Sequence, residues 1–228
     1  MSSLAARLDD IRMRMARAAL RSGRDDVGMV AVTKSVPTAI IAEAIGLGLS
    51  IFGENRVREA RLKIEALPTV EWHFIGRLQT NKVKDVVGRF KLIHSLDRWR
   101  LAEALQQEAQ AKNLQVSVLI QVNLGGESQK GGVSPTELAD FLAATTDLPR
   151  LRVEGLMAIP PYSVDPEESR PYFREMFRLF YNCRMSGREM KILSMGMSND
   201  FEVAIEEGAN LIRVGSLLFD REKYSQEE

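Results

Sequence analysis

Short apolar runs alternate with longer helical patterns along almost the whole chain, and this alternation constrains the fold more than any other feature. Eight runs have the length and apolar content of buried strands: 29–33, 50–53, 71–76, 91–95, 116–123, 151–157, 191–195 and 210–215. Helical patterns fill the intervals: 38–47, 55–66, 79–87, 98–112, 134–146, 166–184 and 199–207. Such alternation is typical of a parallel sheet covered by helices.

Eight such strands alternating with helices in a chain of 228 residues favour an α/β fold of the (β/α)8 or TIM-barrel type. A doubly wound open sheet is the alternative. With 45% hydrophobic residues and no linker-like stretch, the chain is expected to form a single domain over 1–228, with the barrel over roughly 29–222.

An extra N-terminal helix is expected over residues 3–22. Its apolar residues recur at helical spacing: Leu4, Leu8, Ile11 and Met15. Its arginines lie largely on the other side: Arg7, Arg14, Arg17 and Arg21. A basic amphipathic helix can lie on a membrane or grip RNA, but Asp9 and Asp10 dilute the charge, so we expect a solvated outer face.

The overall charge and the cysteine content exclude several classes of protein. Thirty-one basic residues balance thirty-one acidic ones, so neither nucleic acid nor an anionic membrane is the expected partner. The lone cysteine, Cys183, excludes an intramolecular disulfide framework and cysteine-rich zinc sites. With no signal-like or spanning apolar stretch at the N-terminus, a cytoplasmic location is expected.

Polar residues and glycines follow the predicted strands, at the edge where barrels of this type place their functional residues. Along the chain these are Lys34, Asn55, Gly76, Arg77, Ser95, Asn123, the stretch 194–198 and the stretch 213–216. The last two stretches combine glycine and serine, which allow close backbone approach to an anion and supply hydroxyl donors. Loops after strands seven and eight often hold phosphate in barrels.

A lysine that faces a phosphate site suggests Schiff-base chemistry, because a lysine amine can attack an aldehyde. Pyridoxal phosphate (PLP) supplies both an aldehyde and a phosphate, and a phosphorylated sugar in an aldolase does so too. No metal site is expected, since His73 and His94 lie inside strand runs and are better explained as hydrogen-bonded core or mouth residues. Cys183 is expected to be an inert helical thiol.

Seven segments between residues 29 and 219 carry a family likeness: AVTKSVP, FGENRVREA, EWHFIGRLQTNK, IHSLDR, VNLGGESQKGGV, GLMAIPP and LSMGMSNDFEVAIEEGANLIRVGS. In this order they resemble the motifs of the YggS/PROSC-type PLP homeostasis proteins. The resemblance implies the type III PLP barrel that is also the N-terminal domain of alanine racemases. The long last segment is the most specific of the seven.

The resemblance also implies roles for single residues. Lys34 would hold PLP covalently as an internal aldimine, and Arg213 would face the pyridine nitrogen. The other cofactor-binding residues implied are Ser198, Gly215 and Ser216 at the phosphate, and Asn55 and His73 in the ring pocket. The chain departs from the family pattern at Asn199, Ser216 and Asp220, which leaves the shape of two helix starts open.

The resemblance to racemases also raises the question of catalysis. Racemases need a second acid/base, a tyrosine that resembles one supplied by an additional domain and the partner subunit, whereas this sequence ends at Glu228, soon after the eighth predicted strand. We therefore expect a protein that holds PLP for vitamin B6 homeostasis without catalytic turnover, passes it to apo-enzymes, and is a monomer or weak homodimer. The alternatives are an amino-acid racemase or related enzyme using water or Tyr162, and an interaction module with a vestigial site.

Overall fold

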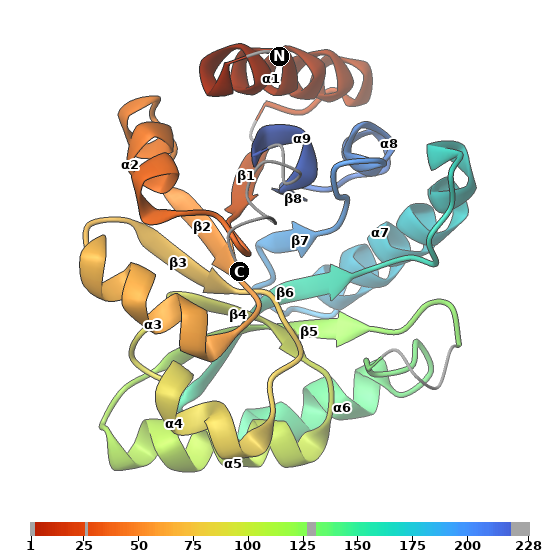
Figure 1. The fold of residues 1–228 in the computed structure, drawn as a ribbon. Helices are drawn as coiled ribbons and strands as arrows, with labels where there is room; N and C mark the ends of the chain where they lie inside the picture. The colour runs from red at the N-terminus through yellow and green to blue at the C-terminus, as the bar shows by residue number, and fades with distance from the viewer. Residues whose placement is uncertain (1–2, 26, 127–130, 220–228) are drawn as a thin grey trace.

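A computed structural model describes residues 3–25, 27–126 and 131–219, and shows a closed barrel of eight parallel strands (Figure 1). The strands are β1 (Gly28–Val32), β2 (Ile51–Glu54), β3 (Glu71–Phe74), β4 (Leu92–Leu96), β5 (Val116–Val122), β6 (Leu151–Ala158), β7 (Ile192–Ser194) and β8 (Leu211–Val214). Each strand pairs with its neighbour in sequence, and β1 pairs with β8, with Ala31 opposite Val214. The TIM barrel is therefore confirmed, and the open sheet is wrong.

Helices connect the strands and cover the outside of the barrel (Figure 1). The α-helices are α1 (Leu4–Ser22), α2 (Thr38–Gly46), α3 (Val57–Ala66), α4 (Val83–Val86), α5 (Trp99–Ala111), α6 (Leu138–Ala144), α7 (Arg170–Met185), α8 (Phe201–Glu206) and α9 (Ser216–Phe219). Three short 3-10 helices are η1 (Thr80–Lys82), η2 (Thr145–Asp147) and η3 (Pro166–Ser169). None of the helices in the described ranges combines the length and the apolarity that crossing a membrane requires.

The sequence Ser134, Pro135 and Glu137 is typical of a helix cap and predicts that the helix over 134–146 starts there, but the observed helix starts later. Ser134 and Glu137 do form the expected reciprocal contacts: the Glu137 N–H donates to Ser134 Oγ at 3.2 Å, and the Ser134 N–H donates to Glu137 Oε2 at 3.4 Å. These contacts close a turn, and α6 begins only at Leu138. The capping signal therefore marks the turn that leads into the helix.

Apolar side chains form two separate layers. A large core fills the space between the strands and the helices, and a smaller cluster fills the barrel lumen: Val30, Leu92, Leu119, Met157 and Leu211. On β4 and β8 the lumen-facing residue two positions further along is polar, His94 after Leu92 and Arg213 after Leu211. The lumen therefore changes from apolar to polar toward the C-terminal ends of these strands.

The helix α1 lies across α8 and α9, beside the seam where β1 meets β8 (Figure 1). Its N-terminus is capped by Ser3 Oγ, which accepts from the Ala6 N–H at 3.2 Å, and it ends at Gly23, whose φ of 65° suits glycine. Its apolar stripe is buried as predicted. The helix thereby extends the core over the closing seam.

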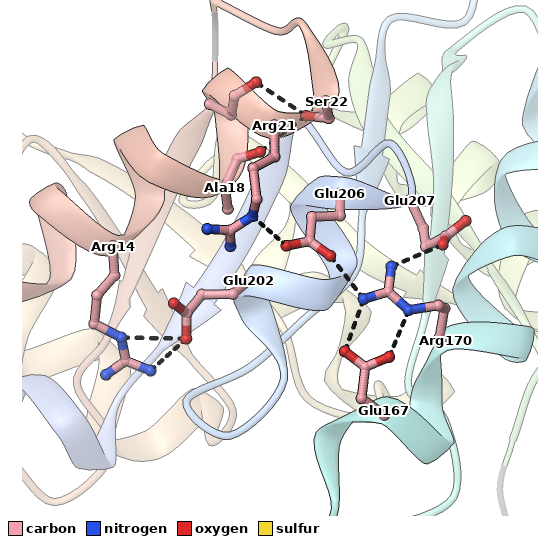
Figure 2. Close-up of polar contacts among 10 residues, drawn as sticks. Arg14, Ala18, Arg21, Ser22, Glu167, Arg170, Glu202, Glu206 and Glu207 are labelled. Carbon is pink, nitrogen blue, oxygen red and sulfur yellow. Dashed lines mark hydrogen bonds and ion pairs between the residues drawn. The ribbon is translucent and has the colours of Figure 1, made fainter.

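The prediction that the basic side of α1 is a solvated face is wrong in part. Arg14 Nη2 lies 2.7 Å from Glu202 Oε2, and Arg21 Nε lies 2.7 Å from Glu206 Oε1 (Figure 2). Arg7 Nε donates to the Leu218 carbonyl oxygen at 2.7 Å. Helical periodicity separates a basic side from an apolar one, but it does not show which acidic residues of a distant helix lie opposite.

Arg170 extends this ion-pair network to the start of α7. Arg170 pairs with Glu206 at 2.7 Å, with Glu207 at 2.9 Å and with Glu167 at 2.6 Å (Figure 2). The hydrogen bonds to these carboxylates, that to Glu167 first, raise the pKa of Arg170 above its ordinary value. Because Glu206 contacts both Arg21 and Arg170, the network joins α1 to α7 through α8.

Candidate functional site

The loops after β1, β7 and β8 meet at one end of the barrel. Lys34 lies half-buried in the turn directly after β1, and its neighbour Ser35 has a φ of 57°, which is uncommon for a residue other than glycine. The register that sets Ala31 opposite Val214 brings the loop of Lys34 next to the loop that begins at Gly215. The structure thus places Lys34 and Gly215 on adjacent loops of the barrel mouth.

A buried polar cluster holds the backbone just before Lys34. Lys63 Nζ, from α3, donates to the Thr33 carbonyl oxygen at 2.6 Å and to Glu54 Oε1 at 2.7 Å. The Thr33 hydroxyl donates to the same Glu54 oxygen at 2.6 Å. Thr33 and Glu54 are fully buried and Lys63 is 9% exposed, so these bonds form away from solvent. They tie the end of β1 to β2 and α3 and limit where Lys34 can move.

Sequence reasoning missed both charged members of this cluster. One signal was present: Lys63 falls three residues after the buried Ala60, on the side of α3 that packs against the barrel. A lysine on a buried helix face needs a carboxylate partner. Glu54 directly precedes Asn55 at the end of β2, where such a partner was available.

The loops after β7 and β8 are joined through the hydroxyl of Ser198. Ser198 Oγ accepts from the N–H of Gly215 at 3.3 Å and from the N–H of Leu217 at 3.5 Å. Gly196 turns the first loop with a φ of 89°, and a Cβ there would lie 2.5 Å from Ala204 Cβ. A hydroxyl and two backbone N–H groups therefore converge at the predicted phosphate position, with Gly215 buried and Ser216 exposed beside them.

Arg213, from β8, is buried at the same end of the lumen. Its Nη1 donates to Ser194 Oγ at 2.6 Å and its Nη2 to the Ala158 carbonyl oxygen at 2.9 Å, so β6 and β7 hold the guanidinium in place. Burial lowers the pKa of Arg213 to about 10, with the carboxylate of Asp200 acting in the opposite direction. Arg213 therefore remains a cation at neutral pH.

A chain of hydrogen bonds continues from Ser194 across the lumen. Ser194 Oγ lies 3.1 Å from His94 Nδ1, and His94 Nε2 lies 3.0 Å from His73 Nδ1. The other ring nitrogen of His73, Nε2, lies 2.9 Å from Glu71 Oε1. Both ring nitrogens of each histidine are thus engaged within the protein, which confirms that both are hydrogen-bonded residues of the core or mouth. The series of hydrogen bonds ends at Glu71, the first residue of β3, which is exposed to solvent.

The buried His94 in this series of hydrogen bonds predicts a specific loss of stability in acid. Burial, followed by the charges of His73 and Arg213, lowers the pKa of His94 well below its ordinary value of 6.5. The unfolded state therefore binds a proton that the folded state excludes, and stability falls as the pH drops below about 6.5, by up to about 1.4 kcal/mol per pH unit. Urea unfolding at pH 7.5, 6.5 and 5.5 should show this slope, and His94→Gln should reduce it.

Asp200 also makes the stability depend on pH, and its contribution has to be separated from that of His94. Burial raises the pKa of Asp200, so its contribution to stability changes in the opposite direction, being lost as the pH rises above 3.8 through the raised value. The wild type and His94→Gln both contain Asp200, so the difference between their slopes of stability against pH reports on His94 alone. Equal slopes in the wild type and His94→Gln would contradict the assignment.

Asn55 lies half-buried in the loop after β2. A Cβ on Gly76, in the loop after β3, would overlap the backbone oxygen of Asn55, so glycine is required for the two loops to touch. Asn55 Oδ1 is buried and accepts no hydrogen bond from the described residues. Asn199, one of the departures from the family pattern, donates from Nδ2 to the Ser163 carbonyl oxygen at 3.1 Å.

The described residues contain no group of three or more His, Cys, Asp or Glu side chains able to hold a metal ion. Burial raises the pKa of the Cys183 thiol. Asp220, another departure from the family pattern, lies outside the described residues.

Comparison with known proteins gives concordant matches over nearly the full chain. The family model "Alanine racemase, N-terminal domain" matches residues 7–222. A pyridoxal phosphate homeostasis protein of Aquifex aeolicus is 48% identical, covering 96% of this chain and 98% of the relative, and one of Escherichia coli K12 is 37% identical, covering 99% and 100%. The structure of PipY of Synechococcus elongatus PCC7942 with PLP bound superposes with a TM-score of 0.83 at 34% identity, covering 95% and 100%.

Proposed function

We propose, from the premise that the chain belongs to the family of pyridoxal phosphate homeostasis proteins with an alanine racemase N-terminal domain, that it binds PLP and serves PLP homeostasis. The observation that carries the proposal is the placement of Lys34 beside the loops joined by Ser198 and Gly215. PipY, a protein of the same fold at 34% identity, binds PLP, which favours PLP over a phosphorylated sugar. The curated relatives are named homeostasis proteins rather than enzymes.

In this proposal Lys34 binds the cofactor covalently. The amine of Lys34 adds to the aldehyde carbon, water leaves, and an imine results. The donors present fit a phosphate: the hydroxyl of Ser198 and the N–H groups of Gly215 and Leu217 lie together, in loops next to that of Lys34. The two N–H groups donate to Ser198 Oγ in this structure, and a bound phosphate would replace that oxygen as their acceptor. Ser216, exposed at the start of α9, adds a second hydroxyl. When bound, the cofactor supplies an aldehyde and an electron-withdrawing ring.

The remaining predicted site residues orient the ring. Arg213 faces the pyridine nitrogen, and a cation held there disfavours protonation of that nitrogen, which makes the ring a weaker electron sink. Asn55 and His73 line the ring pocket. His73 also contacts His94, which contacts Ser194, and Ser194 Oγ accepts from Arg213 Nη1.

We also propose that the protein delivers PLP from this bound form to apo-enzymes. Imine formation reverses when water or another amine attacks, so an apo-enzyme with a free active-site lysine can accept the cofactor. In this proposal the protein is cytoplasmic and acts as a monomer or weak homodimer. The balanced charge and the lone cysteine of the chain are compatible with this setting.

Substitution of Lys34 tests the proposal directly. After incubation with PLP and removal of the excess, the wild type should show a visible imine band that borohydride abolishes, and Lys34→Ala should lack it. Lys82→Ala, which removes an exposed lysine near the mouth, is the matched control and should retain the band. A wild type without a band, or a Lys34→Ala variant with an unchanged band, would contradict the assignment and direct attention to Lys82 or Lys130.

The same loaded protein separates a carrier from an enzyme. Incubation with single-enantiomer amino acids in deuterated water should leave the Cα hydrogen in place, because a carrier has no acid/base pair for its exchange. Mass spectrometry and chiral chromatography measure the result. Enzyme-dependent deuterium incorporation that disappears in Lys34→Ala would establish the racemase alternative.

A further inference from the structure

A basic cleft opens beside the barrel mouth, over the C-terminal ends of β2, β3 and β4. Its volume is about 1020 Å³, at the upper end of the range for small-molecule sites. Six cationic side chains line it against one carboxylate, Asp85; the cations are Arg56, Arg58, Arg61, Arg77, Lys82 and Arg98. Because the chain as a whole is neutral, this excess of positive charge is a local feature.

Two of these cations are held by a buried carboxylate. Asp97, with a side chain only 2% exposed, pairs with Arg98 and lies 3.5 Å from Arg77 Nε. Arg98 also donates from Nη2 to the Leu78 carbonyl oxygen at 2.9 Å. The position of the Arg98 guanidinium is therefore restricted before any ligand arrives, which lowers the entropy cost of binding, whereas the Arg77 side chain remains 67% exposed.

Two other cations have no carboxylate partner within the described ranges. Arg58 and Lys82 are both exposed and form no ion pair there, whereas Arg56 lies 2.9 Å from Glu59 and Arg61 lies 3.7 Å from Glu65. Nearby carboxylates thus partly neutralise the rest of the cleft, and Arg58 and Lys82 supply its uncompensated charge. An anion that binds here gains two cationic partners without breaking an existing ion pair.

Two residues that line the cleft, Asn55 and Phe74, indicate which class of ligand fits it. Asn55 Oδ1, at the border with the ring pocket, is a buried acceptor without a hydrogen-bond donor, so a ligand with a hydroxyl or N–H group satisfies it. Phe74, the aromatic residue of the lining, is 1% exposed and offers no surface on which a base can stack. This disfavours single-stranded nucleic acid, which relies on such stacking.

We propose that the basic cleft is a second anion-binding site, separate from the loops of Ser198 and Gly215, and that it binds a small organic phosphate. The ligand carries at least two negative charges for Arg58 and Lys82, and a hydrogen-bond donor for Asn55. This site needs neither Lys34 nor an aldehyde. The proposal therefore goes beyond the PLP-binding function, although the two sites border each other at Asn55.

Titration of the full-length protein with inorganic pyrophosphate, followed by isothermal calorimetry, tests the site. The double variant Arg58→Ala/Lys82→Ala should bind pyrophosphate at least about tenfold more weakly than the wild type, because it loses two charge-assisted contacts. Arg17→Ala/Arg100→Ala removes the same charge from exposed positions outside the cleft and should bind like the wild type. Ser198→Ala should also retain the affinity.

Each other outcome overturns the proposal. These outcomes are no binding to the wild type, equal binding to the cleft double variant, an equal loss in the outer double variant, and a loss in Ser198→Ala alone. Arg58→Lys/Lys82→Arg preserves both charges and should restore most of the affinity, which excludes misfolding as the cause of a loss. The imine band of each variant is recorded separately, so failure of this site and failure of PLP binding are distinguishable.

Discussion

Replacement of Lys63 by methionine is expected to lower the free energy of unfolding by about 3–5 kcal/mol. Methionine fits the space but leaves the Glu54 carboxylate fully buried without its cation, and the Thr33 carbonyl oxygen without its donor. An uncompensated buried charge is among the most destabilising changes that one substitution can make. Urea unfolding followed by circular dichroism measures the loss.

A second variant shows that the loss comes from the charge and not from packing. Lys63→Met/Glu54→Leu removes both members of the pair, and it should recover a large part of the stability because no buried charge remains. Lys84→Met, an exposed lysine on α4, controls for the loss of a lysine and should change stability by less than about 0.5 kcal/mol. A loss of under 1 kcal/mol in Lys63→Met would show that water reaches Glu54, contrary to its burial.

Replacement of Gly155 by alanine is expected to cost at least about 3 kcal/mol. Gly155 lies on β6 opposite Ile192 of β7, and a Cβ there would overlap the backbone oxygen and carbon of Ile192. Backbone atoms cannot rotate away as a side chain does, so the two strands must separate. The separation would also displace Ala158 and Ser194, which hold Arg213.

Gly46→Ala is the matched control for this variant. Gly46 is the last residue of α2, and a Cβ there meets nothing within 4 Å. Alanine favours the helix over glycine by about 0.5–1 kcal/mol, so the control should be neutral or slightly more stable. Both variants are compared by thermal and urea unfolding. Similar stabilities for the two would show that the β6–β7 pair has room for a methyl group.

The strands were predictable because each is a buried apolar run flanked by polar residues. Predicted and observed strand ends differ by no more than two residues, as in 71–76 against Glu71–Phe74. Closure was harder to predict, because the pairing of β1 with β8 joins segments at opposite ends of the chain. The count of eight strands and helices favoured it, but the pairing itself appears only in the structure.

The site was predictable where it follows from strand order and not where it follows from contacts across the lumen. The placement of Lys34, Ser198 and Gly215 at one end of the barrel was predictable because parallel strands end at the same edge of a barrel. The contact between His94 and Ser194 joins residues 100 positions apart, and no local pattern in the sequence announces it. The cluster of Lys63 with Glu54 was missed for a different reason, since a lysine in a helix is usually read as exposed.

The helix at the start of the chain has a consequence for the order of folding. The buried stripe of α1, which includes Leu8 and Ile11, packs against α8 and α9, and the bond from Arg7 to the Leu218 carbonyl spans 211 positions. During synthesis, α1 leaves the ribosome well before its partners α8 and α9. Contacts this distant in sequence form late. The nascent chain therefore carries an uncovered apolar helix through most of translation, and this is the segment where we expect a chaperone to engage.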